Sequence, residues 1–276
     1  MDRSDNSLKS RLARKELCLC MAVTCARTTD MALMVEAAGL DAFYVDMEHY
    51  PISMETASSL CTAALSSRVA ALVRVPAHDR HFIGRALDGG AAGVIVPHVD
   101  SAQEARAIVD AARFPPLGKR GVPGPNAVTR FRRQSAADTI ADMDPGVVVI
   151  AMLESPEAIE AADEIAAVPG VDILLVGSND LTLAMGIPGQ LRSHLLYEAF
   201  AHVSEACARH GKTLGVAGIR DDMELASRLV GLGGRFFVAG SDSGYLIAAA
   251  QANASQFRAI DLGPASKVSD DPAMHG

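Results

Sequence analysis

The sequence has no tryptophan, and aromatic residues make up only 4% of its 276 residues. No apolar run approaches the ~20 residues that cross a bilayer, so no membrane-spanning helix is expected. The N-terminal residues, which begin Met1-Asp2-Arg3, lack the apolar centre of a signal peptide. Basic residues are outnumbered by acidic ones, 25 to 33, and the formal net charge is −8. Nucleic-acid binders need a positive face, so this balance argues against nucleic acid as a partner.

Cysteines are few, odd in number and without a C-x-x-C pair. Four of the five lie in apolar segments, which favours buried free thiols over disulfides or a redox site. Free thiols are typical of a reducing compartment, so we expect a cytoplasmic protein. The five are Cys18, Cys20, Cys25, Cys61 and Cys207.

Short aliphatic segments alternate with longer segments of helical spacing. Two of them, residues 147–150 and 173–176, are apolar throughout, as in a parallel sheet that is buried on both faces. The alternation predicts an α/β fold, a closed (β/α)₈ TIM barrel, with residues 1–262 as a single domain and residues 263–276 as a mobile tail. A doubly wound open sheet is the alternative, but the G-x-G-x-x-G turn expected after its first strand is absent. The predicted strands are 17–24, 42–46, 70–75, 93–97, 147–154, 172–177, 213–217 and 235–239.

One connection, residues 114–134, is too long for a simple link between two elements of a barrel. It contains four prolines, three glycines and five basic residues. We expect it either to cover the mouth of the barrel or to reach a neighbouring subunit. Arg120 within it is expected to be a solvated basic side chain, and contact with the substrate or with a neighbouring subunit is the alternative.

Two carboxylates follow consecutive apolar strands. In a barrel of this type the reactive groups lie where strands end, so Glu154 and Asp180 are expected to converge there. Close carboxylates repel, which favours a proton on one of them or a divalent cation between them. Oxygen ligands suit Mg²⁺ or Mn²⁺, with Co²⁺ as a further option. The alternative is that each residue only caps the helix that follows it.

A cation and a histidine also follow predicted strands. Arg74, after the third strand, offers a planar donor fork to a carboxylate or an oxyanion. Its alternative role is an ion pair with Asp46 or Glu48 on the adjacent strand end. His49 follows the second strand in a D-x-E-H-x-P turn, which favours proton transfer. The other histidines lack such a setting, and His98 is the least certain of them.

Six segments together resemble the HpcH/HpaI aldolase family. Its members are metal-dependent (class II) pyruvate aldolases that act on 4-hydroxy-2-oxo acids. The resemblance runs in order from about residue 17 to residue 250 and covers nearly the whole domain. It rests on D-M-E-H-Y-P (46–51), V-R-V-P (73–76), A-L-D-G-G-A-A-G-V-I-V-P (86–97), F-P-P-L-G-K-R-G (114–121), M-L-E-S-P-E-A (152–158) and V-G-S-N-D-L-T (176–182).

The resemblance implies roles for individual residues. Glu154 and Asp180 would hold the divalent ion, and Arg74 would bind and polarise the pyruvate moiety. The backbone around Ser178 and Asn179 would bind the pyruvate carboxylate. The family also implies a (β/α)₈ barrel that assembles as a hexamer, a trimer of dimers, with the last helix exchanged between partners.

The resemblance further places His49 in the acid–base relay and pairs it with Asp88. Asp88 ends a helix that runs away from the mouth, whereas His49 lies at the mouth. A helix of some ten residues separates its two ends by roughly 15 Å. We therefore expect Asp88 to reach His49 from a neighbouring subunit, unless the helix is unusually short or tilted.

The sequence departs from the family pattern at two places. Met152 stands where the best-known members have glutamine, and residues 122–126 read V-P-G-P-N where small residues and a serine are common. The metal ligands are retained, so these departures bear on substrate orientation and on the acceptor aldehyde.

The residues themselves suit cleavage of a C3–C4 bond to give pyruvate and an aldehyde, because an ion and Arg74 would stabilise the enolate. No lysine stands at a predicted strand end, which disfavours a Schiff-base aldolase. Condensation of an oxo acid with an acyl-CoA, as in citrate or malyl-CoA chemistry, is the main alternative. A phosphosugar isomerase and a non-catalytic binding protein on an enzyme fold are the others.

Overall fold

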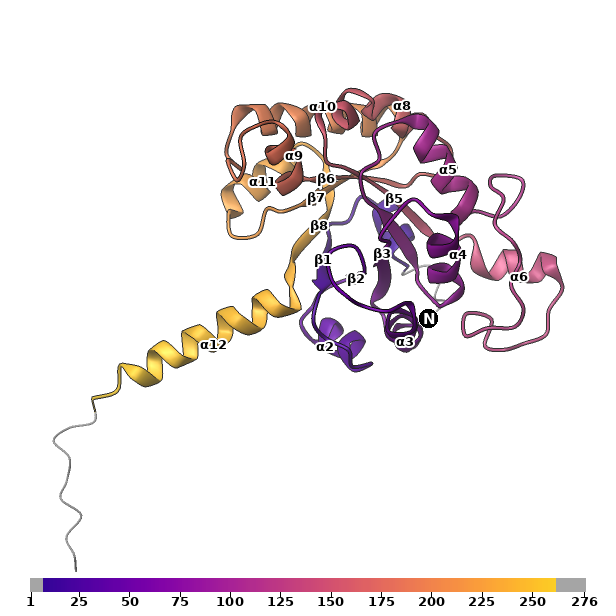
Figure 1. The fold of residues 1–276 in the computed structure, drawn as a ribbon, viewed down its shortest axis with the longest axis horizontal. Helices are drawn as coiled ribbons and strands as arrows, with labels where there is room; N and C mark the ends of the chain where they lie inside the picture. Colours follow the sequence, from indigo (N-terminus) through magenta and orange to yellow (C-terminus); the bar gives the residue numbers. More distant parts are fainter. Residues whose placement is uncertain (1–6, 262–276) are drawn as a thin grey trace, which may run out of the picture.

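The structure is a computed structural model in which residues 7–261 are described. Within this range, eight parallel strands close into a barrel in the order β1 to β8, which confirms the predicted (β/α)₈ TIM barrel (Figure 1). The predicted tail, residues 263–276, lies outside the described residues. The strands are β1 (Cys18–Val23), β2 (Ala42–Asp46), β3 (Ala70–Arg74), β4 (Gly93–Val96), β5 (Val148–Leu153), β6 (Ile173–Gly177), β7 (Thr213–Ala217) and β8 (Gly234–Ser241).

Helices follow the strands and form the outer layer of the barrel (Figure 1). Several begin at a serine or aspartate whose side chain accepts a hydrogen bond from the first turn, as Ser53, Asp79 and Ser101 do. The helices are α1 (Leu8–Ala13), α2 (Met31–Ala37), α3 (Met54–Ala64), α4 (Arg80–Asp88), α5 (Ala102–Ala112), α6 (Ala136–Met143), α7 (Pro156–Glu160), α8 (Ala162–Ala167), α9 (Ser178–Ala184), α10 (His194–His210), α11 (Met223–Gly231) and α12 (Asp242–Arg258).

The strands are buried on both faces, because apolar layers lie inside and outside the barrel. In β5, Val148, Ile150 and Met152 belong to the interior layer. The alternate residues of that strand pack against the helices. This arrangement explains why the strands read as continuous apolar segments rather than as alternating ones.

The N-terminal helix α1 covers the end of the barrel at which the strands begin. Its Leu8 and Leu12 are buried in the same apolar layer as the barrel interior. Side chains that follow the strands are therefore displayed at the opposite end, which we call the mouth.

The segment 114–134 does not cover the mouth. Arg120 is only 5% exposed and pairs with Asp88 at the end of α4, on the side of the barrel where strands begin. Its guanidinium also lies over the ring of Phe114, 4.6 Å from the centroid. The expectation of a solvated Arg120 was wrong, because its carboxylate partner Asp88 lies 32 residues away in the sequence.

The helix α12 projects away from the barrel (Figure 1) and has no buried residue. Helical spacing in the sequence extends only over 244–252, so the sequence alone indicates a shorter helix than the one observed. Among the described residues, none of the helices combines the length and apolar character that crossing a membrane requires.

Candidate active site at the mouth of the barrel

The turn after β2 is organised by the side chain of Asp46, which is 1% exposed. Its Oδ1 accepts hydrogen bonds from the backbone N–H groups of Glu48 at 3.1 Å and His49 at 3.4 Å. These bonds fold residues 46–49 into a tight turn at the rim. The D-x-E-H pattern thus has a local structural cause.

Arg74, the last residue of β3, is fixed beside this turn. Its Nε and Nη2 donate to the two carboxylate oxygens of Asp46 at 3.0 and 2.6 Å. Its Nη1 lies 2.9 Å from Oε2 of Glu48. Burial alone would lower the pKa of Arg74, but the carboxylate of Asp46 raises it above its usual value, so the guanidinium stays charged. Arg74 therefore does form the ion pairs that were its alternative role, and these pairs hold its planar donor fork in one orientation.

Glu154 follows β5 and is 3% exposed. The helix-capping alternative does not apply to it, because Ser155 is the residue that caps α7. Its Oε2 accepts a hydrogen bond from the backbone N–H of His98 at 3.1 Å, and its Oε1 has no hydrogen-bond partner. Burial raises the pKa of Glu154 to about 7; the His98 N–H group opposes this, and the charges of Glu48 and Asp180 add to it.

His98 links the two carboxylates across the mouth. Its Nε2 lies 3.1 Å from Oε1 of Glu48, and its Nδ1 lies 3.4 Å from Oε2 of Glu154. It adopts a left-handed backbone conformation with φ of 51°, which is uncommon for a residue other than glycine. The chain of contacts Asp46–Arg74–Glu48–His98–Glu154 therefore joins the ends of β2, β3, β4 and β5.

The residues after β6 complete this side of the mouth. Asp180 lies in the first turn of α9, and its charge acts on Glu154. Ser178 is fully buried with no partner for its Oγ, whereas Asn179 is exposed. A Cβ on Gly177 would lie 2.6 Å from Oε1 of Glu154, so only glycine leaves room for that carboxylate.

The structure does not bring His49 and Asp88 together within one chain. The side chain of His49 is 52% exposed at the rim, and its Nε2 lies 3.8 Å from Oε2 of Glu48. Asp88 pairs with Arg120 at the far end of α4. The expected separation of the two residues is thus found.

The residues at the mouth fit a hard divalent cation. Four carboxylates (Asp46, Glu48, Glu154 and Asp180) and one guanidinium, that of Arg74, lie at these strand ends, so acidic groups outnumber the basic one. The unpartnered Oε1 of Glu154 is a buried oxygen that a cation would satisfy. Among residues 7–261, no group of three or more His, Cys, Asp or Glu side chains is placed to hold a metal ion. Two protein carboxylates leave positions for water and substrate oxygens.

Three residues of this site have a larger part than the sequence predicts. The sequence indicates Asp46 and Glu48 only as partners of Arg74, and it assigns no role to His98. The signal for His98 was its position directly after a strand, in V-P-H, the criterion that selected the other residues.

Known proteins that resemble this chain identify its family. The family model HpcH/HpaI aldolase/citrate lyase matches residues 21–249. The 4-hydroxy-4-methyl-2-oxoglutarate aldolase of Hapsidospora irregularis is 37% identical over 94% of this chain and 97% of its own. The crystal structure of an HpcH/HpaI aldolase from Desulfitobacterium hafniense aligns with a TM-score of 0.86 at 30% identity, covering 92% and 98% of the two chains. The citrate synthase SbnG aligns with a TM-score of 0.80 at 29% identity, covering 92% and 98%.

The barrel, its mouth and these matches define the class: the chain belongs to the HpcH/HpaI aldolase/citrate lyase family.

Proposed function

We propose that this protein is a divalent-metal-dependent enzyme that cleaves, or forms, the C3–C4 bond of a 4-hydroxy-2-oxo acid, with pyruvate and an aldehyde as products. That it is an aldolase, and hence a carbon–carbon lyase, follows from its family and from its 37% identical relative. The observation that carries the proposal is the buried, unpartnered oxygen of Glu154, close enough to Asp180 for their charges to interact.

Glu154 and Asp180 would hold the ion, Mg²⁺ or Mn²⁺. When bound, the ion supplies a Lewis acid that favours negative charge on the 2-oxo oxygen of the substrate. His98 supports this role of Glu154, because its backbone N–H holds one carboxylate oxygen and leaves the other free.

Arg74 would bind and polarise the pyruvate moiety. A guanidinium carries five N–H donors, and three of them are directed at Asp46 and Glu48. Of the other two donors, one contacts the sulfur of Met152 at 3.9 Å, a weak acceptor that a substrate oxygen would displace, so two donors would serve the oxygen on which charge develops. Because the carboxylates hold the fork rigidly, no reorganisation is needed when that charge appears.

The 4-hydroxyl proton would leave through His49 or through a water that His49 orients. His49 is half exposed and lies beside Glu48, so it can exchange protons with solvent. Asp88 would support His49 from a neighbouring subunit. The unpartnered Oγ of Ser178, with the backbone around Ser178 and Asn179, would bind the pyruvate carboxylate.

We propose that the substrate carries a second carboxylate on C4, as 4-hydroxy-4-methyl-2-oxoglutarate does, the compound in the name of the 37% identical relative. Cleaving the C3–C4 bond of that compound gives two molecules of pyruvate. The second product is then a ketone rather than an aldehyde.

The test measures pyruvate release from a panel of 4-hydroxy-2-oxo acids, with Mg²⁺ or Mn²⁺ and with excess EDTA. We expect activity that EDTA abolishes and added metal restores. Activity that persists in EDTA would refute the metal role. No release from any member of the panel would refute the aldolase substrate class.

The alternative is condensation of an oxo acid with an acyl-CoA, which the similarity to a citrate synthase favours. A screen with oxaloacetate and acetyl-CoA, followed by detection of free thiol, separates the two reactions. Turnover in that screen without pyruvate release would establish the alternative.

The assembly would be a hexamer, a trimer of dimers that exchange their last helices. In support, α12 buries no residue of its own and leaves Leu246, Ile247 and Phe257 more than half exposed. Exposed apolar side chains in such a number favour a protein interface. Light scattering of the purified protein gives the subunit number, and a monomer would refute this assembly.

We further propose a cytoplasmic location. In support, all five cysteines are free, and four of them are buried.

A further inference from the structure

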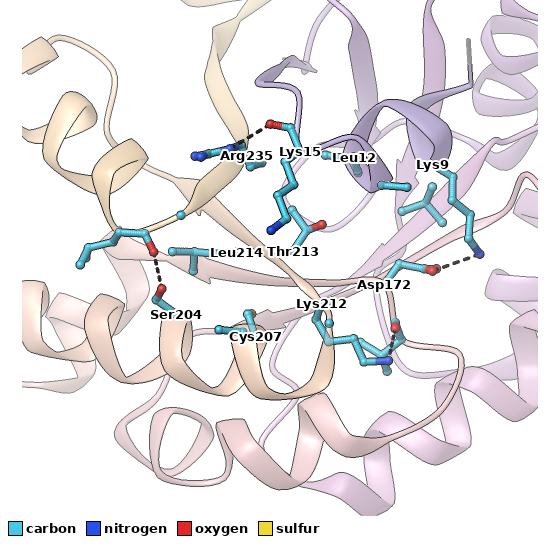
Figure 2. Close-up of a pocket in the computed structure, with 17 residues that line it drawn as sticks. Lys9, Leu12, Lys15, Asp172, Ser204, Cys207, Lys212, Thr213, Leu214 and Arg235 are labelled. Atoms are coloured by element: carbon cyan, nitrogen blue, oxygen red, sulfur yellow. Dashed lines mark hydrogen bonds and ion pairs between the residues drawn. The ribbon is translucent and has the colours of Figure 1, made fainter. Parts of the chain in front are cut away.

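A second cavity, of about 490 Å³, lies at the end of the barrel where the strands begin (Figure 2). It is bounded by α1, the last turns of α10 and the starts of β7 and β8. The five residues of β7 run from this cavity towards the mouth, a distance of roughly 15 Å. A ligand here would not touch the residues of the candidate active site.

The walls of this cavity carry a concentration of positive charge. Lys9, Lys15, Lys212 and Arg235 line it, with Asp172 as the single acidic residue. This clustering contrasts with the net charge of −8 of the whole chain.

Asp172 offsets only part of this charge. Its carboxylate pairs with Lys9 at 3.1 Å and with Arg113, which is not part of the cavity lining, at 2.6 Å, and its charge also acts on Lys212. Cations that surround a hollow repel one another unless an anion lies between them.

Carbonyl groups occupy only part of the donor capacity of Lys212 and Arg235. The Nζ of Lys212 donates to two carbonyls, at 2.8 and 3.3 Å. Arg235 donates through Nε to the carbonyl of Lys15 and through Nη1 to two further carbonyls. An ammonium has three N–H donors and a guanidinium five. One donor of Lys212 and the Nη2 group of Arg235 therefore have no partner within residues 7–261.

Of the cations that line the cavity, Lys15 is the one with the least evidence of a structural role. Its ammonium has no partner in the described part of the chain. In Figure 2 its side chain extends from the segment after α1 towards Thr213, whose hydroxyl is a further donor at the cavity wall. Leu12 and Leu214 supply apolar wall nearby.

We propose that this cavity binds a small metabolite that carries two or more oxyanion groups, carboxylate or phosphate. Charge-assisted hydrogen bonds from Lys15, Lys212 and Arg235 would hold the oxygens. The ligand would join α1 to the first residues of β7 and β8. Its binding should therefore stabilise the fold.

The test is isothermal titration of the full-length protein, freed first of metal and then of the chelator, with citrate and with pyrophosphate, which distinguish a carboxylate from a phosphate ligand. Sodium chloride at equal ionic strength serves as the reference. The variants are Lys15→Gln and Lys212→Gln. Lys119→Gln is the matched control, because it removes the same charge from the exposed segment 114–134. Circular dichroism verifies that each variant is folded.

We expect saturable binding of one probe with a 1:1 stoichiometry and a raised unfolding temperature. Each cavity variant should weaken binding about tenfold, the equivalent of one charge-assisted hydrogen bond, and the control should not. Lys15 is exposed, so its variant should fold even if Lys212→Gln does not. No binding beyond the chloride reference, or equal losses in Lys15→Gln and Lys119→Gln, would overturn the proposal.

Discussion

Replacing Arg74 by lysine keeps the positive charge but removes the planar fork, and so tests whether the fork matters. In the structure the fork makes two hydrogen bonds to Asp46 and one close contact with Glu48. A lysine can satisfy only one of these carboxylate oxygens at a time. Leaving a buried acceptor without its partner costs about 2 kcal/mol. For a domain of this size, that cost lowers the unfolding temperature by about 4–8 °C.

The effect on activity should exceed the effect on stability. Arg74→Lys also removes the two donors that we assign to the substrate, and loss of one such donor typically costs about 100-fold in rate. We therefore expect kcat/KM for pyruvate release to fall by at least about 100-fold at saturating metal, in a protein that is folded at the assay temperature.

The assay combines thermal unfolding with steady-state kinetics. The matched control is Arg228→Lys on α11, whose guanidinium lies over the ring of Tyr197, 4.3 Å from the centroid. This control should keep full activity. If Arg74→Lys lowers the unfolding temperature but stays within a few-fold of wild-type activity, Arg74 has only a structural role and our assignment is wrong.

Three further predictions concern the metal, the assembly and pH. Glu154→Gln should bind Mn²⁺ at least about 100-fold more weakly and lose turnover while its unfolding temperature stays near that of wild type; wild-type affinity in a titration would refute the ligand role. Mixed oligomers of His49→Ala and Asp88→Ala subunits should regain part of the activity that each variant lacks; inactive mixtures of correctly assembled subunits would exclude a site shared between subunits. Asp242→Ala should lower the free energy of unfolding by about 2 kcal/mol, because the carboxylate accepts bonds from the backbone at the end of β1. Burial raises the pKa of Asp242, but hydrogen bonds from the Thr24 hydroxyl and from these backbone N–H groups lower it below its usual value. Its contribution to stability is therefore full above the usual aspartate pKa and is lost progressively as the pH falls through the lowered folded-state pKa. Denaturant unfolding of wild type and variant at pH 3 and pH 7 checks this, since the difference between them should shrink at pH 3.

The barrel could be predicted because its determinants are local. Each strand is an apolar segment of about five residues, and the parallel arrangement follows from the helices between the strands. The sequence did not predict where a helix is interrupted or how far a helix extends when it stands apart from the barrel. The segment 156–166 reads as one helix but forms α7 and α8, with a break at Ala161. The length of α12 was underestimated because its exposed side chains give no apolar periodicity to follow.

One criterion predicted the residues of the candidate site, namely that a residue with a reactive side chain follows directly after a strand. That criterion selected Glu154 and Asp180, and the charge of Asp180 contributes to the raised pKa of Glu154. The criterion predicted a contact between neighbouring strand ends, the ion pair of Arg74 with Asp46 or Glu48, but no contact between strand ends that are distant in the sequence. His98 shows the consequence, because its bond to Glu154 spans 56 residues.

Asp88 forms an ion pair with the buried Arg120. If Asp88 contacts a neighbouring subunit, the guanidinium of Arg120 therefore lies at the same interface. Two of the guanidinium nitrogens, Nε and Nη1, are buried without a hydrogen-bond partner. If Asp88 supports His49 across an interface, Arg120 fixes the orientation of the Asp88 carboxylate. In the subunit-mixing experiment, an Arg120→Met subunit should then behave as an Asp88→Ala subunit does. It should therefore complement His49→Ala but not Asp88→Ala. Complementation of Asp88→Ala by Arg120→Met would show that Arg120 acts independently of Asp88.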